Sequence, residues 1–85
     1  MRQFDYIVKD PLGIHARPAG LLVREISQFT SSVTIAKGEK GADAKKIFSL
    51  MGLGIKCGDT VSVTVEGADE DNATAALERF MEASW

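Results

Sequence analysis

One short segment combines side chains able to take up and hold a phosphate group. His15 is the only histidine of the chain, and Arg17 and Pro18 follow it closely. Proline is tolerated in the first turn of a helix, so we expect a helix to begin at Ala16 with His15 as its N-cap residue. The start of a helix carries unpaired N–H groups and a partial positive charge, which together bind phosphate. His15 is therefore the candidate phosphoryl acceptor, and the backbone N–H groups of Ala16 and Arg17, with the Arg17 guanidinium, are candidates to hold the phosphate oxygens.

A plainer interpretation of the same residues stays open at this point. His15 could merely cap the helix, and Arg17 could be a solvated charge. One histidine and one cysteine, Cys57, are too few ligands for a zinc site, so neither a metal nor another cofactor is predicted. No second acid–base residue is expected near His15, which argues against a free-standing enzyme. The residues and their spacing alone leave both interpretations open.

The composition indicates a single folded domain over residues 1–85. Hydrophobic residues make up 45% of the chain and charged residues 26%, as in ordinary globular proteins. No apolar stretch approaches the roughly 20 residues needed to cross a membrane, and nothing suggests secretion. The single cysteine cannot form an internal disulfide, so a cytoplasmic location is expected. The net charge of −2 argues against non-specific binding of nucleic acid.

Hydrophobic periodicity predicts alternating strands and helices. The patterns indicate strands at 2–9, 32–36, 42–45 and 60–66, and helices at 16–29, at 46–53 and after Asp69, the expected N-cap of the last helix. The order is β-α-β-β-α-β-α. It predicts a two-layer open-faced α/β (α+β) sandwich, in which three helices cover one face of a four-stranded antiparallel sheet. Trp85 is expected to fray or to lie on the surface.

Residues 13–19 read Gly-Ile-His-Ala-Arg-Pro-Ala, a string that resembles the active-site motif of HPr, the histidine-containing phosphocarrier family of the bacterial phosphotransferase system. The resemblance covers the whole chain, including the segments 47–54 and 66–70. It implies that Nδ1 of His15 accepts a phosphoryl group from phosphorylated enzyme I and passes it to a sugar-specific enzyme IIA. Two alternatives stay open: a paralogue in a regulatory or nitrogen-related relay, and a non-catalytic interaction domain with the same fold. A shuttle that presents one site to successive partners is expected to be a monomer.

The second helix has more apolar residues than one buried stripe of a short helix requires. Some of them are expected to be exposed and to form a docking surface for partner proteins, as the family resemblance also implies. One face of the first helix is expected to contribute to the same surface. The residues predicted to dock partners are Gly20, Arg24, Ile47, Phe48 and Met51.

Two positions depart from the pattern of the family. Many HPr proteins have a regulatory serine, phosphorylated by a dedicated kinase, where this chain has Lys46. Lysine cannot be modified in that way, so no regulatory serine is predicted. Leu12 stands where the family often has a small polar residue, and the site is therefore expected to depend more on backbone N–H groups and on Arg17.

Overall fold

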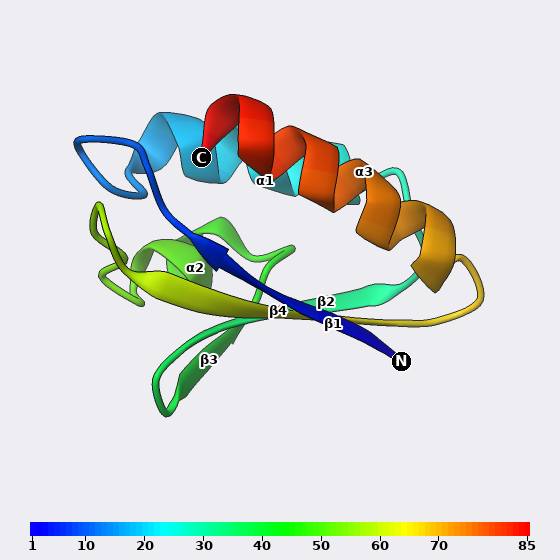
Figure 1. The fold of residues 1–85 in the computed structure, drawn as a ribbon. Helices are drawn as coiled ribbons and strands as arrows, with labels where there is room; N and C mark the ends of the chain where they lie inside the picture. Colours follow the sequence, from blue (N-terminus) through cyan, green and yellow to red (C-terminus); the bar gives the residue numbers. More distant parts are fainter.

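A four-stranded antiparallel sheet carries helices on one of its faces (Figure 1). The computed structural model describes residues 1–85. The strands are β1 (Arg2–Ile7), β2 (Ser32–Lys37), β3 (Lys40–Asp43) and β4 (Thr60–Glu66), and the helices are α1 (Ala16–Ile26), α2 (Ile47–Met51) and α3 (Glu70–Ser84). Element order, strand direction and layering confirm the two-layer sandwich predicted from the sequence.

The sheet has the strand order β1-β4-β2-β3, so β4 and β2 form its centre. Side chains alternate between the two faces of each strand, as the pleat requires. In β4 the valines at 61, 63 and 65 are buried beneath the helices, whereas Thr64 on the other face is partly exposed. Val63 is paired with Phe4 on one side and with Ile35 on the other, which fixes the register of the three strands.

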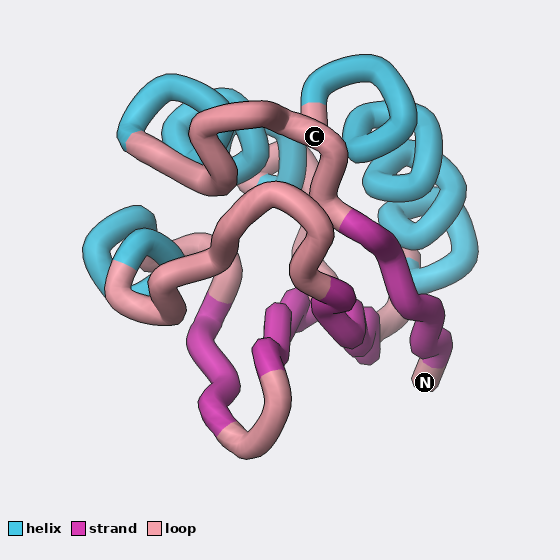
Figure 2. The backbone as a smooth tube through the Cα atoms, turned by 60° about the vertical axis from the view of Figure 1, so that its left-hand side comes forward, coloured by secondary structure: helices cyan, strands magenta, loops and turns pink.

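The loop that leaves β1 runs beside the end of α3, at one end of the sheet (Figure 2). Strand β1 is shorter than predicted, because the backbone N–H groups of Val8 and Lys9 bond to residues outside the strands. The N–H group of Val8 donates to the carbonyl of Asp59 at 2.9 Å, and that of Lys9 donates to the carbonyl of Trp85 at 2.6 Å. The predicted strand 2–9 therefore ends at Ile7.

The predicted helix 16–29 ends at Ile26. Ser27 is its C-cap residue, and the Ser27 hydroxyl donates to the Val23 carbonyl at 2.6 Å. A serine that bonds the backbone in this way competes with continuation of the helix. The Ser27 bond therefore ends the helix before Phe29, which packs against the core from the following loop.

The hairpin between β2 and β3 is tighter than the sequence indicated. Lys37 pairs with Lys40, which leaves a two-residue turn whose first residue, Gly38, has φ +61°. Because the turn is short, β2 extends one residue beyond 32–36, and β3 occupies residues 40–43 instead of 42–45. The predicted helix 46–53 is also shortened, to 47–51, because Gly52 caps its C-terminal end.

Asp69 is the N-cap residue of α3, as predicted, but its side chain makes no capping hydrogen bond. Its carboxylate instead accepts the N–H groups of Thr30 and Ser31, each at 2.9 Å, and the Ser31 hydroxyl. These hydrogen bonds, the Ser31 hydroxyl first, lower the pKa of Asp69 to about 2. Trp85 neither frays nor lies on the surface: it is 2% exposed and belongs to the core.

Candidate functional site

The start of α1 matches the arrangement predicted from the sequence. The helix begins at Ala16, and His15 is its N-cap residue with an extended backbone and a carbonyl that accepts the Ala19 N–H at 3.0 Å. Pro18 lies in the first turn, where its missing N–H leaves no unmade bond. The N–H groups of Ala16 and Arg17 have no acceptor within the protein. Two donors at the positive end of a helix are thus free beside the imidazole.

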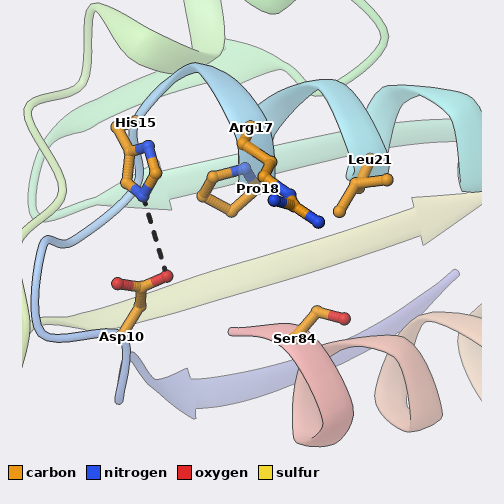
Figure 3. A pocket seen from close by; sticks show the side chains of 6 residues that line it. All are labelled: Asp10, His15, Arg17, Pro18, Leu21 and Ser84. Carbon is orange, nitrogen blue, oxygen red and sulfur yellow. Dashed lines mark ion pairs between the residues drawn. The ribbon is translucent and has the colours of Figure 1, made fainter.

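His15 lies in a shallow pocket of about 220 Å³ between the start of α1 and the end of α3 (Figure 3). The side chain of His15 is 43% exposed, so a partner protein has direct access to the ring. The Arg17 side chain extends along the pocket, away from the ring, in Figure 3. The pocket is lined by Asp10, His15, Arg17, Pro18, Leu21 and Ser84.

Asp10 also lines this pocket, although the sequence did not predict it there. Its Oδ2 atom lies 3.9 Å from Nε2 of His15. The expectation that no second acid–base group lies near His15 is therefore wrong. The two residues are five positions apart in a loop, and no periodicity in the sequence indicates that the loop turns Asp10 back toward the ring.

The loop before His15 rests on the segment that joins α2 to β4. Gly13 adopts φ +69°, a conformation that favours glycine, and a Cβ atom there would lie 2.5 Å from the carbonyl oxygen of Ile55. The next residue, Ile14, donates its N–H to that same oxygen at 3.0 Å. Only glycine allows the two backbones to approach this closely, so Gly13 determines how near the loop that carries His15 lies to Ile55.

The supporting segment is itself held by a charged network. Lys37 forms an ion pair with Asp59 at 2.9 Å and donates to the carbonyl of Gly54 at 2.8 Å. Asp59 also accepts the backbone N–H of Lys56 at 2.8 Å. The hydrogen bond from Lys37, followed by that from Lys56, lowers the pKa of Asp59 below its usual value. The carboxylate thus stays ionised and fixes the segment under the site.

Trp85 holds the site from the opposite side. Its indole Nε1 donates to the carbonyl of Pro18 at 3.2 Å, and its backbone oxygen accepts the N–H groups of Lys9 and Asp10 at 2.6 and 3.0 Å. The sequence contained a signal for this position: Trp85 follows Leu77 and Met81 at intervals of four residues, so it continues the apolar stripe of α3. The end of α3 therefore supports both the first turn of α1 and the loop that contains Asp10.

The residues predicted to dock partners belong to α1 and α2, and they differ in exposure. Phe48 is 86% exposed, whereas Ile47 and Met51 are half-buried and pack against the core, so the exposed arc predicted for α2 consists mainly of Phe48. Gly20 is half-buried, and a Cβ atom there would lie 3.6 Å from Cδ1 of Ile47. Gly20 thus lies where α1 and the Ile47 side chain of α2 come into contact, while Arg24 is exposed on α1.

The lysines near α2 have different surroundings. Lys46 is the N-cap residue of α2, and it is exposed and forms no ion pair. The ammonium of Lys45 donates a hydrogen bond to the carbonyl of Phe29 at 2.9 Å, so it links the turn before α2 to the loop after α1. No group of three side chains is arranged to hold a metal ion, and no helix is long and apolar enough to span a membrane.

Comparisons with known proteins agree over nearly the full chain. A family model described as the PTS HPr component phosphorylation site matches residues 2–83. The phosphocarrier protein HPr of Mycoplasma genitalium is 42% identical over 84 residues, which cover 96% of this chain and 94% of that protein. A crystal structure of HPr from Thermoanaerobacter tengcongensis has a TM-score of 0.93 at 37% identity, covering 99% of this chain and 94% of that one.

A second crystal structure, of an HPr dimer from Thermoanaerobacter tengcongensis, has a TM-score of 0.77 at 37% identity and covers 98% of this chain and 95% of that one. The fold is thus seen in dimers, and the monomeric state expected from the sequence stays a prediction. Identity and coverage in both sequence and structure establish the relationship. The chain belongs to the HPr family of phosphocarrier proteins of the phosphotransferase system.

Proposed function

We propose that His15 is the residue of this phosphocarrier that accepts the phosphoryl group, from phosphorylated enzyme I, and passes it to a sugar-specific enzyme IIA. The observation that carries the proposal is the position of the ring at the N-cap of α1, beside the free N–H groups of Ala16 and Arg17. These donors point to where negative charge arrives with the phosphoryl oxygens. The Arg17 side chain lines the same pocket, and we expect its guanidinium to turn toward the phosphoryl group when that group is bound.

An open site suits a carrier better than a free-standing enzyme. With 43% of its side chain exposed, His15 can be reached by one partner and then by another. A pocket of about 220 Å³ holds a phosphoryl group without enclosing it. Catalysis then consists mainly of positioning and charge stabilisation, much of which the partner protein supplies.

The docking surface in this proposal comprises Gly20, Arg24, Ile47, Phe48 and Met51. Phe48 is its apolar centre because the side chain is exposed and stands between half-buried neighbours. Arg24 adds a charge that can pair with an acidic partner and speed association. We expect both enzyme I and enzyme IIA to use this surface in turn, since each must reach the same histidine.

Intact-mass spectrometry tests the assignment of His15. The protein is incubated with phosphoenolpyruvate, magnesium and enzyme I, beside the variant His15→Ala. One acid-labile phosphoryl group on the wild type, and none on the variant, is the expected result. A folded wild-type protein that takes up no phosphoryl group would contradict the proposal and favour a non-catalytic interaction domain.

The identity of the acceptor is tested in a second step. The phosphorylated protein is mixed with a sugar-specific enzyme IIA or with the corresponding protein of a nitrogen-related relay, and loss of the phosphoryl group is followed. Faster transfer to the sugar-specific acceptor is expected; faster transfer to the other would assign the chain to the regulatory branch. Light scattering during size exclusion is expected to give the mass of a monomer, about 9.2 kDa.

A further inference from the structure

Asp10 takes part in three hydrogen bonds, two through its backbone and one through its side chain. Its N–H donates to the backbone oxygen of Trp85 at 3.0 Å, and its carbonyl accepts the N–H of Gly13 at 2.9 Å. Its Oδ1 atom accepts the N–H of Leu12 at 2.9 Å. The other carboxylate oxygen, Oδ2, makes no hydrogen bond within the protein and lies 3.9 Å from Nε2 of His15.

The orientation of the two side chains distinguishes the two nitrogens of the ring. In Figure 3 the carboxylate lies on the Nε2 side, and the other ring nitrogen points away from it. A carboxylate oxygen only accepts hydrogen bonds, so it favours the tautomer in which the nitrogen facing it carries the proton. The separation of 3.9 Å exceeds a direct hydrogen bond, but one water molecule or a small ring rotation closes it, and such contacts tighten during reaction.

We propose that Asp10 is a positioning residue that holds the proton of the His15 ring on Nε2 and thereby presents the lone pair of Nδ1 to the phosphoryl group. The inference rests on the proposed function for its consequence in phosphoryl transfer, while its effect on the tautomer exists without any partner. The remaining charged group of the pocket, Arg17, is a cation and cannot accept this proton.

The same arrangement serves loading and unloading. In loading, the Nδ1 lone pair forms the new N–P bond while the N–P bond of the donor breaks and the donor imidazole keeps its electron pair. The His15 ring retains the proton on Nε2 and becomes positively charged, opposite the Asp10 carboxylate. In unloading, the electron pair of the N–P bond returns to Nδ1. Because Nε2 still holds its proton, the group that leaves is neutral imidazole and not an imidazolide anion.

The chain offers a matched control for this inference. Asp43 has the same local geometry as Asp10: its Oδ1 accepts the N–H two residues ahead at 2.9 Å, and its carbonyl accepts the N–H three residues ahead at 3.0 Å. No histidine pairs with Asp43. In Asp10→Asn and Asp43→Asn the amide oxygen can keep the turn, so both loops retain their shape, and only the first substitution removes a carboxylate from His15.

Nitrogen-15 NMR of the ring, at a pH at which it is neutral, measures the tautomer directly in the unphosphorylated protein. The wild type and Asp43→Asn are expected to carry the proton on Nε2, and Asp10→Asn to show a larger fraction with the proton on Nδ1. A wild-type ring protonated mainly on Nδ1, or identical spectra for Asp10→Asn and the wild type, would overturn the inference whether or not the chain carries phosphate.

Single-turnover transfer supplies the second readout. Asp10→Asn is expected to lose roughly 10-fold in the rates of loading from enzyme I and of unloading to enzyme IIA, with His15 still phosphorylated at the end point. Asp43→Asn is expected to match the wild type. Unchanged rates in Asp10→Asn would refute the role in transfer. Absence of uptake by the wild type would refute the proposed function and leave the NMR result as the test of Asp10.

Discussion

Removal of the Phe48 side chain separates partner binding from stability. The ring is 86% exposed, so Phe48→Ala removes few contacts of the folded protein. The free energy of unfolding is expected to change by no more than about 0.5 kcal/mol. A partner that covers the ring gains most of the roughly 1.5–3 kcal/mol that burial of a phenylalanine provides. Loss of this contact corresponds to roughly 10- to 100-fold weaker association.

Steady-state transfer from phosphorylated enzyme I measures this effect. The Michaelis constant of enzyme I for Phe48→Ala is expected to rise by that factor, with little change in the turnover number, because Phe48 lies on α2 and does not line the His15 pocket. The same rise is expected with enzyme IIA as the acceptor. Thermal denaturation establishes that the variant remains folded.

Two control variants distinguish loss of partner binding from other effects of removing an apolar side chain. Ile7 is 58% exposed on the other face of the sheet, so Ile7→Ala is expected to leave the Michaelis constant unchanged. Leu50 belongs to α2 but is fully buried, and Leu50→Ala is expected to cost about 2–5 kcal/mol of stability. A Michaelis constant for Phe48→Ala within twofold of the wild type would refute the docking role of α2.

Three further predictions concern the backbone before His15, the cap of α2 and the carboxylate of Asp69. Gly13→Ala places a Cβ atom against the Ile55 carbonyl at a residue with φ +69°, so it is expected to lower both the stability and the rate of phosphoryl uptake. Gly38→Ala is the control, because Gly38 has φ +61° but open space around it. It is expected to cost only the backbone penalty of about 1–2 kcal/mol and to leave phosphoryl uptake normal. Lys46→Ser supplies a side-chain cap for α2 and is expected to raise stability by about 0.5–1 kcal/mol in thermal denaturation; a fall would contradict the capping argument. The pKa of Asp69 is lowered from 3.8 to about 2, so its contribution to stability is present above pH 3.8 and is lost as the pH falls toward 2. Asp69→Asn is therefore expected to make the free energy of unfolding depend less steeply on pH in this acid range. An unchanged pH dependence would refute that role.

The sequence predicted the elements whose causes are local. Strands and helices follow from periodicity, and the start of α1 follows from Pro18, which restricts where that helix can begin. The element boundaries were less accurate because they depend on partners distant in the chain. Lys9, for example, leaves the sheet because its N–H bonds to Trp85.

The candidate site was predicted only in part, for the same reason. His15, Ala16 and Arg17 are neighbours in the sequence, so their joint position at a helix start could be inferred. The approach of Asp10 to the ring depends on how a loop is held by the end of α3, which no local pattern reveals. Likewise, Ile47 is half-buried because α2 packs against the core, and this packing depends on residues distant in the chain.

The position of Trp85 has a spectroscopic consequence. It is the only tryptophan in the chain, and its indole is buried against the first turn of α1, bonded to Pro18. Indole emission depends on the polarity and the charge around the ring, and a phosphoryl group on His15 brings negative charge to that turn. The native protein thus contains its own fluorescent probe at the proposed carrier site, through which loading and unloading by successive partners can be followed in real time without a label.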